Sequence, residues 1–235
     1  MKHQQGATLI IVLMVLLLIM LVGTLAIRQG MSSYKLVTNQ QIQSLLNQNS
    51  DAVFMAFQNP DKTDQYAAPD GIIGFFKNPN HADEELVLCF SGTEPFSLNK
   101  AAKWQQGKME KLSSSGGPCT ATSSAGRDQV TTQVNIRRVG GQEAVAFADF
   151  ARGTDITSAK TEETITLRLQ ATSILSGLVT NLNKIYTGKD SCVYKSAFSD
   201  TDSISQCLNA NSTYSNIQVA EFQFLSDFSS SRTQP

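Results

Sequence analysis

The sequence predicts an α+β fold, in which a long N-terminal helix is followed by an antiparallel β-sheet. Three observations support this prediction. Residues 7–27 form an uncharged apolar run, residues 28–58 carry apolar side chains at helical spacing, and several segments after residue 130 alternate apolar with polar residues. Because a sheet must bury its apolar face, we expect it to wrap the apolar stripe of the helix.

The apolar run at 7–27 has the length of a membrane-spanning helix. As an α-helix it would be about 31 Å long, which is close to the thickness of a hydrocarbon core. A secretory signal peptide has a shorter apolar core and a small-residue cleavage site behind it, whereas Ile27-Arg28-Gln29-Gly30 follows this run directly. We therefore expect the segment to stay in the protein and to anchor it in a membrane.

The next segment, 28–58, continues the helix with one apolar face. The residues that recur at steps of three, four or seven are Tyr34, Thr38, Ile42, Leu45, Ala52, Val53 and Phe57. A coiled-coil stalk is the alternative, but this stripe is too short for sustained heptads. We expect the helix to end at Asn59-Pro60, because proline cannot continue its hydrogen bonding.

The first part of the head has weak patterns. We interpret 59–84 as an irregular connector, since it contains three prolines and the turn pairs Asp70-Gly71 and Asn78-Pro79. A short strand carrying Cys89 is expected at 85–90. A short helix is expected at 100–112, and a loop containing Cys119 at 113–124.

The second part of the head has clearer strands. Alternating residues predict strands at 130–136 and 165–171, and Gly140-Gly141 predicts a hairpin turn with a returning strand at 144–150. Thr166, Arg168 and Gln170 would lie on the solvent face of the 165–171 strand. The remaining predictions are a helix at 174–186 capped by Gly188, and a strand at 217–224 with a bulge between Val219 and Phe222.

The charge balance excludes a strongly electrostatic partner. The formal net charge is −1, so nothing favours nucleic acid or anionic lipid as the main partner. Lys100, Lys103, Lys108 and Lys111 surround Trp104 and could contact DNA through phosphates and stacking. We favour the solvent face of a short helix for these lysines, and expect no direct contact with nucleic acid.

Four cysteines permit three disulfide pairings. We expect Cys89–Cys119 and Cys192–Cys207, because each would close a segment with little regular structure. A metal site is the alternative, but the cysteines lack the spacing of a zinc site and histidine is nearly absent. Disulfides require an oxidising compartment, which places the head outside the cytoplasm.

The sequence contains no convincing catalytic set. His81 is the single imidazole outside the leader, so no Ser-His-acid or Cys-His arrangement can be assembled without it. Asp200 and Asp202 could supply oxygen ligands to calcium, although a solvated turn is the simpler interpretation. We therefore expect no enzyme activity, no cofactor and no resident metal.

The N-terminus carries a more specific motif. Met1-Lys2-His3-Gln4-Gln5-Gly6 is a short polar leader, and Ala7-Thr8-Leu9-Ile10 starts the apolar helix at once. This arrangement resembles the class III signal peptide of type IV pilins and pseudopilins. The resemblance implies that a prepilin peptidase cuts between Gly6 and Ala7 and that the new amine of Ala7 is methylated. The chain departs from most pilins at Ala7, where Phe is usual, and at Ile11, the fifth mature position, where Glu is usual.

A leader of this kind without the Glu is most similar to PilX-type minor pilins, and next to GspK pseudopilins of type II secretion. The motif covers about the first 57 residues and implies a type IV pilin-like fold. The chain then divides into a leader (1–6), a transmembrane and filament-core helix (7–27), its amphipathic continuation (28–58), a periplasmic head (59–228) and a flexible tail (229–235).

The resemblance also implies a function. Such a protein waits in the inner membrane as a single-pass protein, helps to prime type IV pilus assembly and then sits at the surface pilus tip, where it supports adhesion, twitching motility and DNA uptake. Its partners would be the prepilin peptidase, other minor pilins, a PilY-type adhesin, the inner-membrane assembly platform and membrane lipid. The alternatives are a GspK-like tip pseudopilin and a signal-anchored periplasmic binding protein or enzyme.

Overall fold

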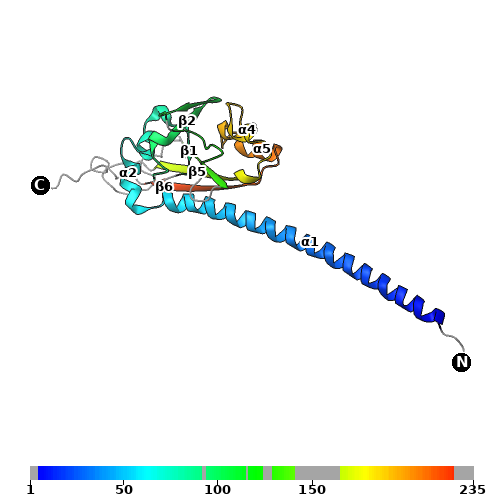
Figure 1. Cartoon of the computed structure of the whole chain (residues 1–235). Helices are drawn as coiled ribbons and strands as arrows, with labels where there is room; N and C mark the ends of the chain where they lie inside the picture. The colour runs from blue at the N-terminus through cyan, green and yellow to red at the C-terminus, as the bar shows by residue number, and fades with distance from the viewer. Residues whose placement is uncertain (1–4, 92–93, 115, 124–128, 141–164, 225–235) are drawn as a thin grey trace, which may run out of the picture. The chain divides into compact units, whose positions relative to one another are not determined.

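The computed structural model describes residues 5–91, 94–114, 116–123, 129–140 and 165–224 of the 235-residue chain (Figure 1). The chain divides into two compact units, Met1–Leu45 and Leu46–Pro235. The first unit is helical throughout its described residues, and the second holds a β-sheet with short helices.

Helix α1 (Gln5–Phe57) begins in the first unit and supplies its last turns to the second. Its segment Leu9–Gln29 has a mean hydropathy of 3.2 and no buried residue, so it is long and apolar enough to span a membrane. The helix stops before Asn59-Pro60, as the sequence predicts, and the Asn59 side chain accepts a hydrogen bond from the Asp61 N–H.

The head contains a six-stranded antiparallel sheet in the order β3-β2-β1-β4-β5-β6. The strands are β1 (Glu85–Cys89), β2 (Ala101–Gln105), β3 (Lys108–Lys111), β4 (Val130–Val139), β5 (Ile165–Leu175) and β6 (Ser215–Phe224). The α+β, pilin-like arrangement of a long N-terminal helix and an antiparallel sheet is therefore present. The strands predicted at 85–90, 130–136, 165–171 and 217–224 are confirmed.

One face of the sheet packs on the last turns of α1 (Figure 1). Val53 and Phe57 are buried against strand residues such as Val134 and Leu167. The Phe57 ring stacks on Tyr66 at 5.3 Å and meets Phe222 at 5.2 Å. Burial of such large side chains stabilises this contact by roughly 1.5–3 kcal/mol each.

The connector 59–84 is more regular than its proline content predicts. It forms α2 (Thr63–Ala67) and α3 (Ile72–Lys77), with short 3₁₀ turns at Pro60–Lys62 and Pro79–His81. Tyr66, Ile72 and Phe76 are buried in the core under the sheet. A Cβ atom on Gly74 would lie 2.2 Å from the Ala68 carbonyl oxygen, so glycine permits the close approach of these helices.

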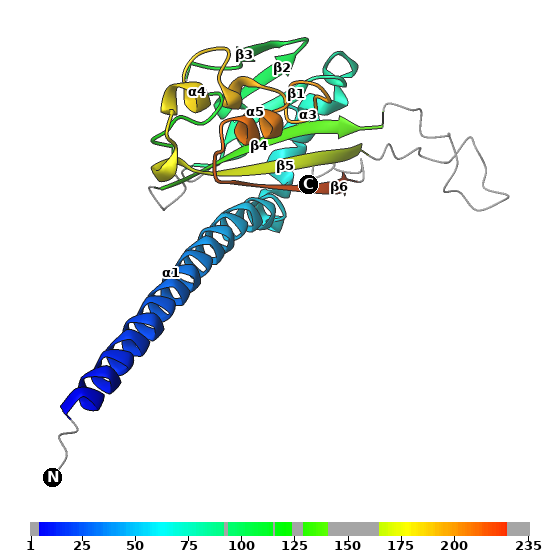
Figure 2. The ribbon, with the colours of Figure 1, turned by 90° about the vertical axis from the view of Figure 1, so that its right-hand side faces the viewer.

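The opposite face of the sheet is covered by a small C-terminal layer. It contains α4 (Leu182–Tyr186), α5 (Ile204–Ala210) and 3₁₀ turns at Ser176–Leu178 and Cys192–Tyr194. Figure 2 shows α5 in front of β4, and Ile204 and Leu208 of α5 pack with Ile174 of β5 in a second apolar cluster. The Tyr186 hydroxyl bonds the Thr131 hydroxyl at 2.7 Å, and burial raises the pKa of Tyr186 to about 12.

The predicted helix at 100–112 is wrong, because this segment forms the β2–β3 hairpin. Gln106 and Gly107 have φ angles of 49° and 82°, which indicate a two-residue hairpin turn. Lys103 pairs with Glu84 at 3.6 Å and with Glu110 at 3.3 Å. The lysines therefore do not form one helical face beside Trp104.

Two predictions in the second half of the head are also wrong. The expected helix at 174–186 is the end of β5, a 3₁₀ turn and the short α4, which ends before Gly188 in the left-handed region at φ 88°. No bulge interrupts β6, because its ten residues pair one-to-one with β5. The predicted strand at 144–150 and the tail at 229–235 lie outside the described residues.

Candidate functional site

The residues of the predicted processing motif lie at the start of α1. The helix begins at Gln5, so the backbone of Gly6 and Ala7 is helical. Ile11 lies one turn further and is 61% exposed. It belongs to the continuous apolar surface of the Leu9–Gln29 segment.

The Cys89–Cys119 disulfide joins the end of β1 to the loop before β4. The backbone N–H of Cys119 donates to the Gln133 side chain at 3.3 Å, so the loop is also held to β4. The Gln133 amide in turn donates to the carbonyl of Val193 at 3.0 Å. Gln133 therefore ties the first disulfide loop to the C-terminal layer.

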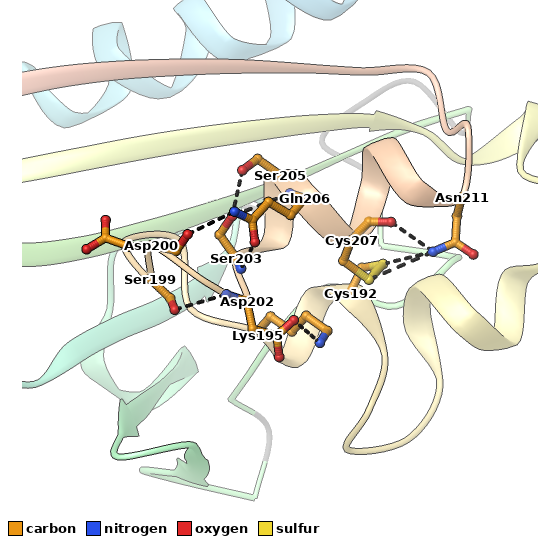
Figure 3. Close-up of polar contacts among 10 residues, drawn as sticks. All are labelled: Cys192, Lys195, Ser199, Asp200, Asp202, Ser203, Ser205, Gln206, Cys207 and Asn211. Atoms are coloured by element: carbon orange, nitrogen blue, oxygen red, sulfur yellow. Dashed lines mark hydrogen bonds and ion pairs between the residues drawn. A yellow bond between two sulfur atoms is a disulfide. The ribbon is translucent and has the colours of Figure 1, made fainter.

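The Cys192–Cys207 disulfide closes a loop with its own internal contacts (Figure 3). Ser203 begins α5 in a capping box with Gln206, because each side chain accepts from the other residue's backbone N–H. Gln206 also donates to the carbonyl of Asp200 at 2.9 Å. Asn211 donates to the carbonyl of Cys207 at 2.8 Å. Both disulfides have the pairing that the sequence predicts.

The two calcium candidates do not converge. Asp202 forms an ion pair with Lys195, and its backbone N–H donates to Ser199 at 3.3 Å. Figure 3 shows the Asp200 carboxylate directed away from this pair. Across the described residues, no group of three His, Cys, Asp or Glu side chains could hold a metal ion.

A buried carboxylate connects the Cys192–Cys207 loop to the sheet through hydrogen bonds. Glu85 of β1 is 4% exposed and accepts hydrogen bonds from Asn135 at 2.6 Å, Ser196 at 2.5 Å and the Ala197 N–H at 2.8 Å. Burial raises the pKa of the Glu85 carboxyl, while these hydrogen bonds and the charge of Arg137 lower it. The result is a polar anchor between β1, β4 and the loop.

Glu85 begins a row of charges across the sheet. The register places Arg137 of β4 beside Glu85, Arg168 of β5 beside Arg137, and Glu221 of β6 beside Arg168. Arg168 and Glu221 form a two-nitrogen ion pair at 2.6 and 2.8 Å. Arg137 lies over the Phe198 ring at 4.9 Å.

A cleft of about 700 Å³ between the sheet and the disulfide loop is lined by Arg137, Arg168, Glu221 and Phe198 of this group, whereas Glu85 lies outside it. Strands β4, β5 and β6 supply Arg137, Arg168 and Glu221, and the loop supplies Ser199 and Asp200. The cleft was not expected from the sequence, because a row of side chains on four strands depends on register. The one sequence feature that could have indicated the cleft is the alternation in β4. It places Gln133, Asn135 and Arg137 on one face of the sheet and Val134 and Ile136 on the other.

His81 has a structural environment. Its ring stacks on Phe75 at 4.2 Å, and its Nδ1 atom lies 2.8 Å from Glu84 Oε2. Neither a serine nor a cysteine is among these partners. No protein-family model, curated protein or solved structure matches the chain, so its function must be inferred from its own residues.

Proposed function

We propose that the chain is a minor pilin that helps to prime type IV pilus assembly and then sits at the pilus tip. The observation that carries the proposal is the combination of the Gly6/Ala7 motif with a long apolar helix whose last turns hold an antiparallel sheet. A pilin needs this combination, because one half of the helix packs in lipid or the filament and the other half carries the head.

Two further features support this proposal. The two disulfides fit a head in the periplasm. The helices between residues 59 and 217 that the structure describes are short, and the longest, α5, has seven residues. This favours a PilX-type subunit over a GspK-like subunit, which carries a large and mostly helical insertion in its head.

The direct test is mass spectrometry of the mature N-terminus, with a Gly6→Leu variant. We expect the normal chain to begin with a methylated Ala7, and the variant to keep residues 1–6 and to remain unassembled in the membrane. Gly23→Leu is a matched control, because nothing lies within 4 Å of a Cβ atom at Gly23. That variant should be processed normally.

Three results would contradict the proposal. An uncut Met1 in the normal protein, or a cut after Ile27, would instead indicate a signal-anchored or secreted periplasmic protein. Normal processing of Gly6→Leu would show that the leader does not act as a class III signal peptide.

A further inference from the structure

The cleft between the sheet and the Cys192–Cys207 loop is built from polar groups of both signs. Its volume is about 700 Å³, within the range of pockets that hold small ligands. It lies entirely within the head, so its properties do not depend on the N-terminal helix.

Arg137 is the cation with free hydrogen-bonding capacity in this cleft. Its Nε atom is buried and has no hydrogen-bond partner among the described residues, and the same is true of Arg138. Because a buried Nε cannot reach a ligand, the terminal guanidinium nitrogens of Arg137 are the ones available in the cleft. No ion pair within that part of the chain includes Arg137. The nearby Glu85 carboxylate is already occupied by Asn135, Ser196 and Ala197. Phe198 supports the guanidinium group from one side, which orients it toward a ligand.

The neighbouring arginine, Arg168, is already paired with a carboxylate. Arg168 lies directly opposite Arg137 in the sheet, but Glu221 neutralises it through two short contacts. Repulsion between the two arginines is thereby reduced, and Arg137 remains as the site for one negative group. A guanidinium group prefers a carboxylate or a phosphate, since it can donate two parallel hydrogen bonds to either.

The rest of the lining distinguishes between these anions. The Asp200 carboxylate forms no ion pair with any described residue, and Glu221 lies at the same cleft. The Asp200 carboxylate repels a phosphate chain or a polyacidic peptide, whereas the charge of Glu221 is offset by Arg168. Both carboxylates can accept hydrogen bonds from neutral hydroxyl groups. Ser199 and Ser205 add hydroxyls to the same wall, and Val219, which is 54% exposed, adds a small apolar surface.

We propose that this cleft binds an acidic carbohydrate, which is a sugar that carries one carboxylate and several hydroxyl groups. The carboxylate binds Arg137, and the hydroxyls bond to Asp200 and the serines of the loop. Val219 contacts the C–H face of the ring. This inference is independent of the proposed pilin function, since blocked processing at Gly6 would leave the cleft unchanged.

Saturation-transfer NMR on the full chain in detergent micelles tests the proposal. The probes are glucuronate, its neutral counterpart glucose, N-acetylneuraminate and a short glutamate-containing peptide. We expect signal transfer to at least one of the two acidic sugars at millimolar concentration and much less to glucose. Arg137→Gln should weaken this binding by roughly ten- to a hundredfold, because a charge-assisted hydrogen bond is lost.

Arg138→Gln is the matched control, because its side chain points to the other sheet face and bonds the carbonyl of Phe76 at 3.4 Å. It should leave binding unchanged. Asp200→Asn provides a second variant in an exposed loop, for which misfolding is not expected, and it should weaken binding several-fold.

Four outcomes would overturn the proposal. The first is equal binding of glucose and glucuronate, and the second is no transfer to either acidic sugar. The third is binding of the acidic peptide in place of the sugars, which would identify the cleft as a protein-docking site. Retained sugar binding in both Arg137→Gln and Asp200→Asn would likewise place the ligand elsewhere.

Discussion

Ser50 places a hydroxyl group in the contact between the last turns of α1 and the sheet. Its Oγ atom lies 2.9 Å from Ser173 Oγ and donates to Asn216 Oδ1 at 3.4 Å. Ser173 also bonds Thr132 at 3.0 Å, so helix, β4, β5 and β6 share one buried polar chain. Because a buried polar group is costly without a partner, this chain favours one position of the helix on the sheet.

We expect Ser50→Ala to lower the free energy of unfolding of the head by about 1 kcal/mol. Ser44→Ala is the matched control, because Ser44 is exposed on the same helix and gains the same helix propensity. Urea unfolding followed by the fluorescence of Trp104, the single tryptophan, measures both variants. Equal midpoints in the two variants would show that the buried hydroxyl chain contributes nothing.

Glu85 should make the stability of the head depend on pH. Burial raises its folded-state pKa above the ordinary value of 4.5, so the folded state holds the proton more tightly than the unfolded state. This contribution to the free energy of unfolding is fully present below pH 4.5 and is lost as the pH rises through the raised folded pKa. Glu85→Gln removes this dependence.

The measurement is the difference in unfolding free energy between the normal chain and Glu85→Gln as a function of pH. We expect the difference to favour the normal chain most below pH 4.5 and to decline toward neutral pH. Other titrating groups cancel in this difference. A difference that increases with pH would mean that the hydrogen bonds from Asn135, Ser196 and Ala197 outweigh burial.

At the residue scale, the sequence identifies partners that are close along the chain better than those that are distant. The disulfide pairs could be predicted, because each joins cysteines around one poorly patterned segment. The charge row of Glu85, Arg137, Arg168 and Glu221 could not, because it requires the register of four strands. A slip of one residue would move Arg168 to the buried face.

At the scale of elements, the two disulfides close different kinds of loop. The Cys89–Cys119 loop contains the β2–β3 hairpin, which pairs with β1, whereas the Cys192–Cys207 loop contains a 3₁₀ turn and the first residues of α5. The cysteines are 30 residues apart in Cys89–Cys119 and 15 apart in Cys192–Cys207. In the chain-entropy model, a loop of 15 residues contributes about 3 kcal/mol and a longer loop slightly more. The second loop also carries one wall of the cleft.

We therefore expect replacement of Cys192 and Cys207 by alanine to lower the free energy of unfolding by about 3 kcal/mol. Urea unfolding of the head provides the measurement, with the normal chain before and after reduction as a reference. Sugar binding should weaken too, because Asp200 and Ser199 lie within this loop. Unchanged stability would mean that the hydrogen bonds of Glu85 to Ser196 and Ala197 suffice to order the loop.

The errors at this scale have two different physical causes. The apparent phase change in β6 arises because the strand carries apolar residues on both of its faces. Phe222 and Phe224 pack in the α1-side cluster, whereas Ile217 and Val219 face the C-terminal layer. Apolar residues on both faces of a regular strand give the same phase change in the sequence pattern as a bulge. The β2–β3 hairpin was missed because its β3 strand is mostly exposed and lacks apolar alternation.

At the scale of the whole chain, the exposed apolar helix determines what the protein must contact. No residue of the Leu9–Gln29 segment is buried in the structure, so its side chains need lipid or other apolar helices around them. The sequence predicts this segment at 7–27, two residues before the Leu9–Gln29 span, because length and composition suffice to recognise it. The packing of the head on the last turns of α1 depends on Val53 and Phe57. Both belong to the apolar stripe that the sequence predicts at 28–58.

Under the proposed function, Ile11 would determine the position that the subunit can take in a filament. In the pilins that this chain resembles, Glu at the fifth mature position pairs with the N-terminal amine of the subunit docked just before it. That pairing offsets the cost of a charge within the membrane, which is about 2.5–3.5 kcal/mol, and it also offsets the cost of burying the amine. If the chain is processed and assembled as proposed, Ile11 brings no carboxylate to an earlier subunit, yet the amine of Ala7 is still offered to the next one.

We therefore expect this protein at the outermost position of the filament, where no earlier amine needs a partner. Crosslinking from Ala7 should reach the Glu of one following pilin, and counting by mass spectrometry should find about one copy per filament. Ile11→Glu should raise the copy number along purified shafts, because the variant can satisfy the amine of a subunit above it, whereas Ile11→Leu should not. Many copies of the normal protein spaced along shafts would contradict the tip position, and an unchanged copy number in Ile11→Glu would mean that the head alone determines it.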